Sequence, residues 1–299
     1  MMAKNNLGNL LLSSPTRKMA EVYLASPTTA LLITGAAGSG KFTLARAISA
    51  GLLQDSADHL DLNPNFTLVQ PHSGQSEISI DAVRNIRRML ALKKPDHERL
   101  RLIVFENADR MSEEAQNALL KTLEEPPTNT TFILTSSTSS GLLPTIVSRT
   151  WNLSVQPVSL SMANSFYEDL NTKDVQKAWS LSGGAPGLFS TLLSDDASHP
   201  LKEAVDRAKR FISSPVYERI IQADQEAGDP NSFWLFLEAL LKITTALHRQ
   251  SAKQGSRHAA ILLKNRKLII GLQKNLEVRA NYRLVGLELA LSLKSVKLV

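Results

Sequence analysis

The chain has 299 residues, 43% of them hydrophobic and 21% charged, with no cysteine and a net charge of +6. This composition is ordinary for a globular protein of two or three domains, and it excludes disulfides and thiolate metal sites. No run approaches about 18 consecutive apolar residues, so no membrane-spanning helix is predicted. The first residues show no convincing cleavage site, so no secretory signal is expected, and the lack of cysteine fits a cytoplasmic location.

Short apolar runs alternate with helical patterns through the first half of the chain. Helical patterns occupy residues 79–92 and 112–125, where Ser79 and Ser112 are suited to the N-cap position. Strands that alternate with helices predict a mostly parallel sheet covered by helices, which is an α/β fold. The predicted strands are residues 30–34, 66–70, 101–105, 131–136 and 151–155.

After Val155 the strand patterns end and helical patterns continue to the C-terminal region. This change predicts an α/β domain over residues 1–156. A small helical domain is predicted over 157–196, and an all-α domain over 197–299.

Positive charge is concentrated in the last of these domains. From Lys242 onward there are 12 Lys or Arg and two acidic residues, a net charge of +10 that leaves −4 for the rest of the chain. One interpretation is contact with nucleic acid. The other is a helical bundle whose cationic faces meet solvent or an acidic neighbour, and the sequence leaves both open. The six histidines lack the spacing of metal ligands, so no metal site is predicted.

Residues 35–44, GAAGSGKFTL, nearly complete the phosphate-binding motif G-x-x-x-x-G-K-[ST] between a strand and a helix. Small residues let consecutive backbone N–H groups surround a phosphate, and Lys41 can reach its oxygens. Phe42 replaces the hydroxyl that binds Mg²⁺, and Thr43 is displaced by about 100° around the helix. The candidate nucleotide-binding residues are Gly35, Gly38, Ser39, Gly40, Lys41, Phe42 and Thr43.

The second half of such a site is an acidic pair after a buried strand. Here the strand at 101–105 is followed by Glu106, which keeps a carboxylate, and by Asn107, which cannot act as a general base. Asp109 is expected to cap the next helix instead. Both halves are altered, so we expect this chain's own ATP hydrolysis to be weak or absent.

The region from Glu106 to Thr150 carries two specific motifs, NALLKTLEEPP at 117–127 and LPTIVSR at 143–149. It closely resembles the AAA+ clamp-loader subunits of bacterial DNA polymerase III, most of all the delta-prime branch, to which the gamma/tau ATPases are related. The resemblance is strong from the P-loop to residue 195 and weaker in the C-terminal region. It implies an AAA+ P-loop domain with a parallel five-stranded sheet, a helical lid and an all-α collar used in oligomerisation.

The resemblance also implies roles for particular residues. Ser148 and Arg149 match the pair that supplies a catalytic arginine finger in trans to the ATP of a neighbouring subunit; the alternative for Arg149 is a surface ion pair. Ser136 or Ser137 falls at the first sensor position. The basic second sensor would fall at Leu188 and is absent. The four-cysteine zinc module of many relatives is missing, so no zinc is implied.

Together with the altered P-loop, the resemblance implies a stator subunit that helps to load the sliding clamp onto primer-template DNA during replication, in a hetero-pentameric ring with gamma/tau-like ATPases and a delta-like subunit. Binding of ATP or ADP is left open, with Mg²⁺ only if nucleotide is bound. One alternative is an active gamma/tau-like ATPase in which Glu106 and Thr43 substitute adequately for the usual acidic and hydroxyl residues. The other is a stand-alone nucleic-acid-binding protein with a vestigial P-loop.

Overall fold

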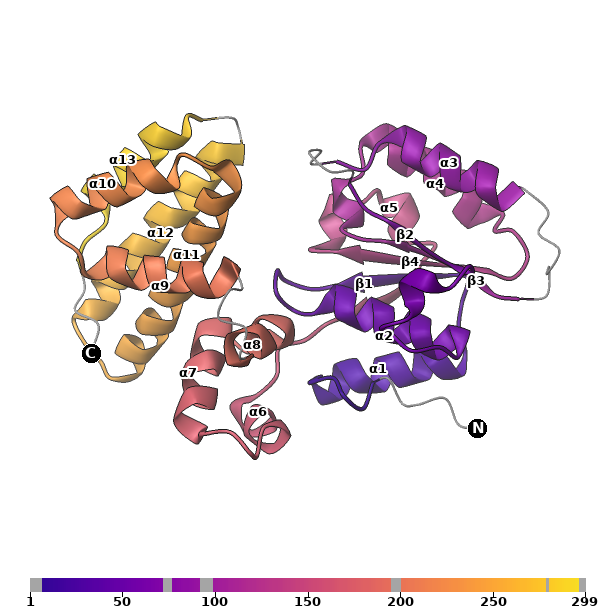
Figure 1. The fold of residues 1–299 in the computed structure, drawn as a ribbon, viewed down its shortest axis with the longest axis horizontal. Helices are drawn as coiled ribbons and strands as arrows, with labels where there is room; N and C mark the ends of the chain where they lie inside the picture. The colour runs from indigo at the N-terminus through magenta and orange to yellow at the C-terminus, as the bar shows by residue number, and fades with distance from the viewer. Residues whose placement is uncertain (1–6, 72–76, 92–98, 195–199, 278–279, 296–299) are drawn as a thin grey trace. The chain divides into compact units, whose positions relative to one another are not determined.

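The computed structural model forms two compact units, drawn in Figure 1. The first contains residues 1–168 and 185–188, and the second contains 169–184 and 189–299. The predicted division into three domains, with borders at 156 and 196, stays a prediction. The structure describes residues 7–71, 77–91, 99–194, 200–277 and 280–295.

The first unit is built on a five-stranded parallel sheet with the strand order β2-β3-β4-β1-β5. This confirms the parallel five-stranded sheet that the sequence predicts. β4 is central and all seven of its residues are buried, as expected for a parallel strand covered on both faces. The strands are β1 (Ala30–Thr34), β2 (Phe66–Val69), β3 (Arg101–Phe105), β4 (Thr130–Ser136) and β5 (Trp151–Ser154).

Helices cover both faces of this sheet (Figure 1). Leu31 and Ile33 pack on one face with helices α1 and α2, whereas Leu32 packs on the other with α3, α4 and α5. This alternation follows from the two-residue period of a strand. The helices are α1 (Ser14–Ala25), α2 (Lys41–Leu53), α3 (Ile80–Ala91), α4 (Glu113–Glu124) and α5 (Pro144–Val147).

The predicted helix caps are confirmed. Ser112 Oγ accepts a hydrogen bond from the backbone N–H of Ala115 at 3.2 Å, and Ser79 Oγ accepts one from Ala82 at 3.3 Å. Each bond satisfies one of the N–H groups that a helix start leaves without a partner. The described residues of the first unit also form three short 3-10 helices: Leu60–Leu62, Ala108–Arg110 and Ser139–Gly141.

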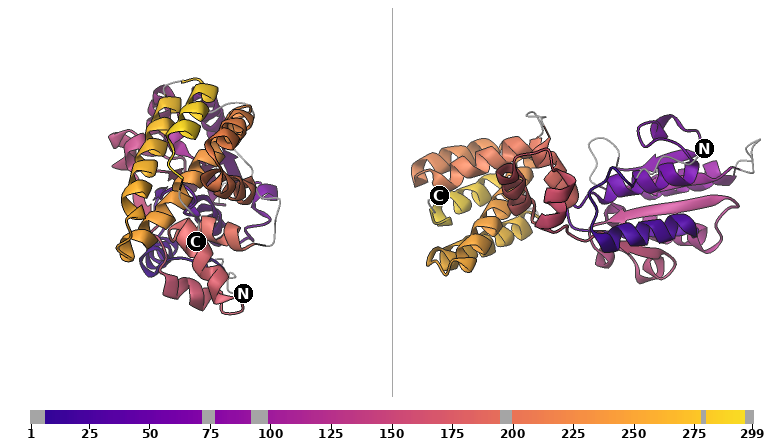
Figure 2. Two further views of the ribbon diagram at one scale, coloured as in Figure 1. Left: turned by 90° about the vertical axis from the view of Figure 1, so that its left-hand side faces the viewer. Right: turned by 90° about the horizontal axis from the view of Figure 1, so that it is seen from below.

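The second unit is helical throughout the residues that the structure describes (Figure 2). The long helix α11 packs against α9 and α12, around a core that includes Phe211, Phe233 and Phe236. The helices after the sheet are α6 (Leu160–Phe166), α7 (Thr172–Ser182), α8 (Pro186–Leu193), α9 (Pro200–Ser213), α10 (Val216–Glu226), α11 (Pro230–Lys253), α12 (His258–Glu277) and α13 (Tyr282–Ser292).

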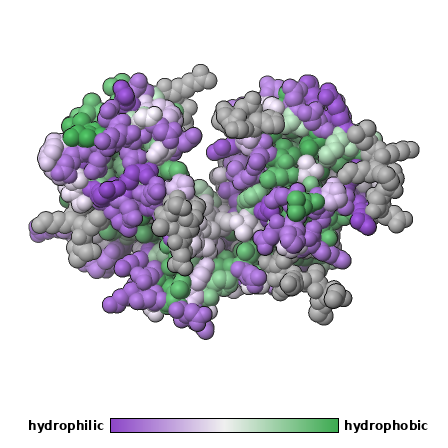
Figure 3. Space-filling model, viewed as in Figure 1, coloured by the Kyte–Doolittle hydropathy of each residue, from purple (hydrophilic) through white to green (hydrophobic). Residues whose placement is uncertain are grey.

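Helices α10 and α13 pack together and leave apolar side chains on the surface of this unit. Tyr217 and Ile221 of α10 are 66% and 56% exposed, and Leu284 and Leu291 of α13 are 67% and 58% exposed. Figure 3 shows hydrophobic residues gathered over these two helices. These side chains of α10 and α13 thus face outward, whereas Ala223, Val285 and Leu289 of the same two helices are buried in the core of the unit.

Candidate functional site

The loop between β1 and α2 has the backbone of a phosphate-binding loop; we call residues 35–43 the P-loop segment. Gly38 and Gly40 have φ angles of 75° and 79°, in the left-handed region that glycine enters without strain. α2 begins directly after Gly40, which has no side chain to cap the first N–H groups. The positive end of the helix therefore meets the loop, as an anion site requires.

Ser39 lies inside this loop and is 4% exposed. Its Oγ has no hydrogen-bond partner within the described structure. A Cβ atom at Gly35 would lie 2.5 Å from this oxygen, so a side chain at position 35 would force Ser39 to move. A buried hydroxyl without a partner is a candidate to bind a ligand oxygen.

A second glycine segment packs directly on the P-loop segment. The backbone N–H of Leu188 donates to the carbonyl oxygen of Gly38 at 2.7 Å. A Cβ at Gly187 would lie 2.9 Å from both N and Cα of Gly40 and 3.0 Å from the Gly38 oxygen. The two backbones are in contact at a distance that only glycine permits at 187. Leu188, where a basic sensor would fall, thus presents an apolar side chain at the loop.

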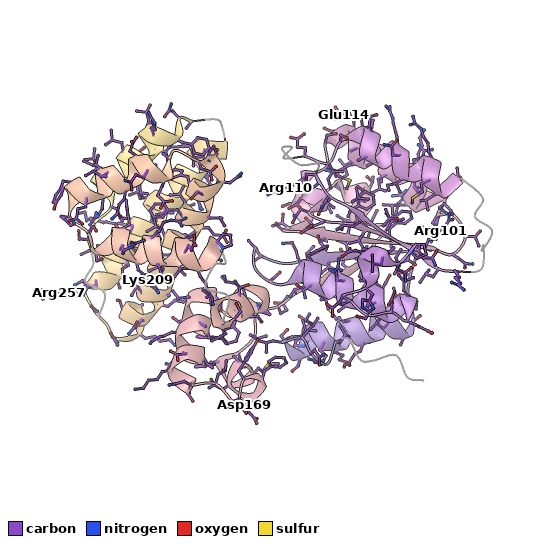
Figure 4. All side chains as sticks on the ribbon, in the orientation of Figure 1. Arg101, Arg110, Glu114, Asp169, Lys209 and Arg257 are labelled. Carbon is purple, nitrogen blue, oxygen red and sulfur yellow. The ribbon has the colours of Figure 1, made fainter. Side chains whose placement is uncertain are left out.

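Lys41 and Glu106 share the carboxyl edge of the sheet. Lys41 is the first residue of α2 and is 9% exposed, while Glu106 follows β3 and is half-buried. Burial raises the pKa of the Glu106 carboxyl, and the positive charges of Lys41 and Arg110 oppose that rise. Figure 4 labels Arg101, the first residue of β3, and Arg110, in the 3-10 helix that follows this strand, toward opposite ends of the sheet.

Phe42 serves packing in this structure. Its ring is partly buried against the core formed by α1, α2 and the sheet. The Arg46 guanidinium lies over the rings of Phe42 and Phe66, 5.9 Å and 5.8 Å from their centroids. Arg46 is held by a two-point contact with Asp61, at 2.9 Å for each nitrogen–oxygen pair. The position that normally carries a Mg²⁺-binding hydroxyl is therefore part of an aromatic–arginine contact.

The residues of the P-loop segment fit a phosphate better than they fit a metal-bound nucleotide. The glycine backbone, the open start of α2, Ser39 and Lys41 are suited to anionic oxygens. Phe42 offers no oxygen to Mg²⁺, and Thr43 is exposed on the next position of the helix. No step of hydrolysis at this chain's own P-loop follows from these residues.

The end of β4 is tied to both the P-loop segment and β3. The Gly35 N–H donates to the Ser136 carbonyl at 3.2 Å, and the Ser136 hydroxyl donates to the Thr138 carbonyl at 2.5 Å. The buried Thr135 Oγ1 accepts from the Asn107 N–H at 2.9 Å. Ser136, at the predicted sensor position, therefore lies next to the loop with its hydroxyl used internally.

The prediction that Asp109 caps the following helix is wrong. Its Oδ2 accepts a hydrogen bond from the Ser137 N–H at 3.0 Å, and Ser112 caps α4. Asp109 lies in the 3-10 helix Ala108–Arg110, too far ahead of Glu113 to bond the first N–H groups of α4. The carboxylate instead ties the end of β3 to the end of β4.

Residues 143–149, which we call the arginine segment, contain α5 and end at Arg149. The Arg149 side chain is 38% exposed. Its Nη2 lies 2.8 Å from Glu124 Oε1, and its Nη1 donates to the Thr145 carbonyl at 3.1 Å. The Ser148 hydroxyl donates to the same carbonyl at 3.1 Å. Arg149 thus forms a surface ion pair with Glu124, and its guanidinium stays partly exposed on the outside of the unit.

Gln116 was missed by sequence reasoning and anchors the arginine segment. It is 7% exposed on α4, and its Oε1 accepts from the Leu143 N–H at 2.8 Å. Its Nε2 donates to the carbonyls of Met111 at 3.2 Å and Gly141 at 3.4 Å. The sequence shows this polar residue directly before the motif NALLKTLEEPP, but it does not show that the residue is buried.

The structure brings the predicted residues together in two groups. The P-loop segment, Glu106 and Ser136 meet at the carboxyl edge of the sheet, whereas Ser148 and Arg149 bond to α4 and α5. Within the described part of the chain, no group of three or more His, Cys, Asp or Glu side chains is placed to hold a metal ion. None of the described helices is long and apolar enough to span a membrane.

Comparisons with known proteins identify relatives of this chain. A sequence model of the family described as "DNA polymerase III, delta subunit" matches residues 22–159. DNA polymerase III subunit delta' of Haemophilus influenzae is 42% identical over 95 residues, which are 31% of this chain and 28% of the relative. The Escherichia coli subunit delta' is 30% identical over 228 residues, 69% of this chain and 67% of the relative.

A solved structure, a DNA polymerase III gamma subunit-related protein from Thermotoga maritima, is similar in fold. Its TM-score is 0.53 at 16% identity, covering 93% of this chain and 98% of that one. The fold and the site define a P-loop protein of the AAA+ class. With the sequence matches, the chain belongs to the delta-prime family of DNA polymerase III subunits. It spans 28% and 67% of the lengths of the two relatives described above.

Proposed function

We propose that this chain is a clamp-loader subunit that helps to load the sliding clamp onto primed DNA during replication. Family membership supports this assignment. In the proposal, the chain works in the cytoplasm with gamma/tau-like ATPases and a delta-like subunit in a hetero-pentameric ring. It contacts the clamp and primer-template DNA as part of that complex.

Within the ring, we propose that the chain acts as a stator and supplies Arg149 to the ATP of a neighbouring subunit. A contrast between two positions carries this role. Arg149 is exposed and held by contacts with Glu124 and the Thr145 carbonyl, whereas Phe42 stands in the P-loop where a hydroxyl would bind Mg²⁺. A guanidinium is charged at all physiological pH values and can stabilise charge that develops on a γ-phosphoryl group. In this proposal, the ATPase activity of the chain itself is weak or absent.

The exposed apolar surface of α10 and α13 supports assembly through the C-terminal helices. It includes Val216, Tyr217, Ile221, Leu284, Leu287 and Leu291, whose exposed fractions range from 41% to 67%. Apolar side chains gathered on adjacent helices are typical of a surface buried by a partner. We therefore assign the collar contact to this pair of helices.

A loader reconstituted with this chain tests the proposal. Arg149→Ala should leave assembly intact and lower the ATPase rate of the complete complex by at least about tenfold, with a matching loss of clamp loading, because arginine fingers contribute large factors to turnover. Arg149→Lys, which keeps the charge and loses the planar fork, should recover part of the rate. An unchanged ATPase rate for Arg149→Ala would reject the proposed role.

An active gamma/tau-like ATPase is the second candidate, favoured by the glycine backbone of the loop and by the nearness of Lys41 to Glu106. The chain alone, assayed with primed DNA, separates the two. Turnover near about 1 per second, within the ordinary range for enzymes, would support the ATPase. Turnover at background supports the stator. Bound ATP or ADP without turnover is compatible with the stator.

A further inference from the structure

The contact between Glu124 and Arg149 joins two elements of the first unit. Glu124 is the last residue of α4, and Arg149 follows α5. One guanidinium nitrogen meets the Glu124 carboxylate at 2.8 Å and the other bonds to the Thr145 carbonyl at 3.1 Å. Since a guanidinium has five N–H groups, these two bonds fix its plane and leave further donors for an outside acceptor.

The electrostatic surroundings favour a cation at this position. The C-terminal end of α4 carries partial negative charge, and Glu125 follows Glu124. Glu124 also lines an open hollow of about 430 Å³ together with Arg87, Lys121 and Glu125. The Glu124 carboxylate is in direct contact with the Arg149 guanidinium.

The same contact is poorly suited to stabilising the fold. The side chains of Arg149 and Glu124 are 38% and 48% exposed. Ion pairs so open to solvent contribute little to folding stability. Arginine, however, has many rotamers, and a group that must meet a phosphoryl group gains from being held in place beforehand. The contact is therefore better suited to orientation than to stability.

We propose that Glu124 is a positioning residue for Arg149, an inference that rests on the proposed action of Arg149 in trans. Glu124 and the Thr145 carbonyl hold the guanidinium so that its remaining N–H groups face the triphosphate bound by the neighbouring subunit. Glu124 itself does not touch the phosphate. It acts by removing the rotational freedom of Arg149 before the transition state forms.

The experiment measures ATP turnover of the assembled loader containing Glu124→Gln. We expect kcat to fall about three- to tenfold, with KM for ATP and the concentration needed for assembly unchanged, since only the orientation of Arg149 is altered. Glu125→Gln is the matched control, because it removes the same charge from the adjacent exposed residue. Its kcat should stay within twofold of the unmodified complex. In an Arg149→Ala background, Glu124→Gln should have no further effect.

The outcomes distinguish this inference from the proposed function. If Arg149→Ala leaves kcat unchanged, the trans role fails and the inference fails with it. If Arg149→Ala lowers kcat but Glu124→Gln does not, the inference alone fails. It is also overturned if Glu124→Gln acts equally in the Arg149→Ala background, if it changes KM or assembly instead of kcat, or if it raises kcat.

Discussion

The P-loop segment and the arginine segment belong to the same α/β unit but are built from different kinds of contact. The P-loop segment keeps its shape through backbone contacts, such as the 2.7 Å bond from Leu188 N–H to the Gly38 carbonyl. The arginine segment is held by two side chains of α4: Gln116 accepts a hydrogen bond from the Leu143 N–H, and Glu124 forms an ion pair with Arg149. A backbone can therefore keep the form of a phosphate site after side chains needed for chemistry have changed. The arginine segment retains the side chain that carries the proposed function.

The largest stability effect is expected at Gln116, because it makes three hydrogen bonds in a buried position. Gln116→Met keeps a similar size but leaves the Leu143 N–H and two carbonyls without this partner. The free energy of unfolding should fall by about 2 kcal/mol, measured by urea denaturation. Asn117→Ala, at the exposed next position, should change it by less than about 0.5 kcal/mol. A Gln116→Met loss no larger than the control's would show that side-chain bonds do not hold the arginine segment.

Gly187→Ala tests the backbone contact on the P-loop segment. The added Cβ would lie 2.9 Å from the backbone of Gly40, so the two segments must separate or distort. We expect a cost of about 1–2 kcal/mol and amide exchange at Leu188 at least about tenfold faster, measured by hydrogen exchange.

Gly271→Ala is the control for this change, because a Cβ there meets nothing within 4 Å and the site lies inside α12. It should be neutral or stabilising by up to about 1 kcal/mol. Leu188 exchange that is equally slow in Gly187→Ala and in the unmodified protein would contradict the close contact.

The smallest effect is expected at Glu106, whose carboxyl pKa is raised by burial. A raised pKa in the folded state means that ionisation costs stability, and the cost is present above the folded pKa and absent below the ordinary value of 4.5. Glu106→Gln should therefore stabilise the chain at neutral pH by roughly 0.5 kcal/mol, a small value because solvent screens the exposed part of the group. This gain in the free energy of unfolding should disappear as the pH falls below the ordinary carboxyl pKa.

Urea denaturation of Glu106→Gln across this pH range is the check. If Glu106→Gln destabilises the chain at neutral pH, the prediction is wrong. The attraction of the Glu106 carboxylate to Lys41 and Arg110 would then exceed the cost of burying it.

Much of the fold could be predicted from local sequence patterns. All five strands were predicted within one residue at each end, and the caps at Ser79 and Ser112 are confirmed, because periodicity and capping depend on neighbouring residues. The P-loop and the arginine motif were also visible as short runs of letters. Short sequence patterns therefore predict the backbone conformation of a few neighbouring residues well.

The tertiary contacts at the site could not be predicted in the same way. Asp109 was assigned to a local cap, but it bonds to Ser137, 28 residues away. Glu124 and Arg149 are 25 residues apart, and Gly187 meets Gly40 from 147 residues away. Such contacts depend on how elements pack, and a single sequence gives the residues without their distances.

The most direct test of the account compares two variants of this chain in the assembled loader. Lys41→Ala removes the lysine of this chain's own P-loop, and Arg149→Ala removes the guanidinium offered to the neighbour. We predict that ATP turnover of the complex stays within about twofold for Lys41→Ala and falls at least about tenfold for Arg149→Ala. The reverse pattern, a large loss with Lys41→Ala and none with Arg149→Ala, would contradict it.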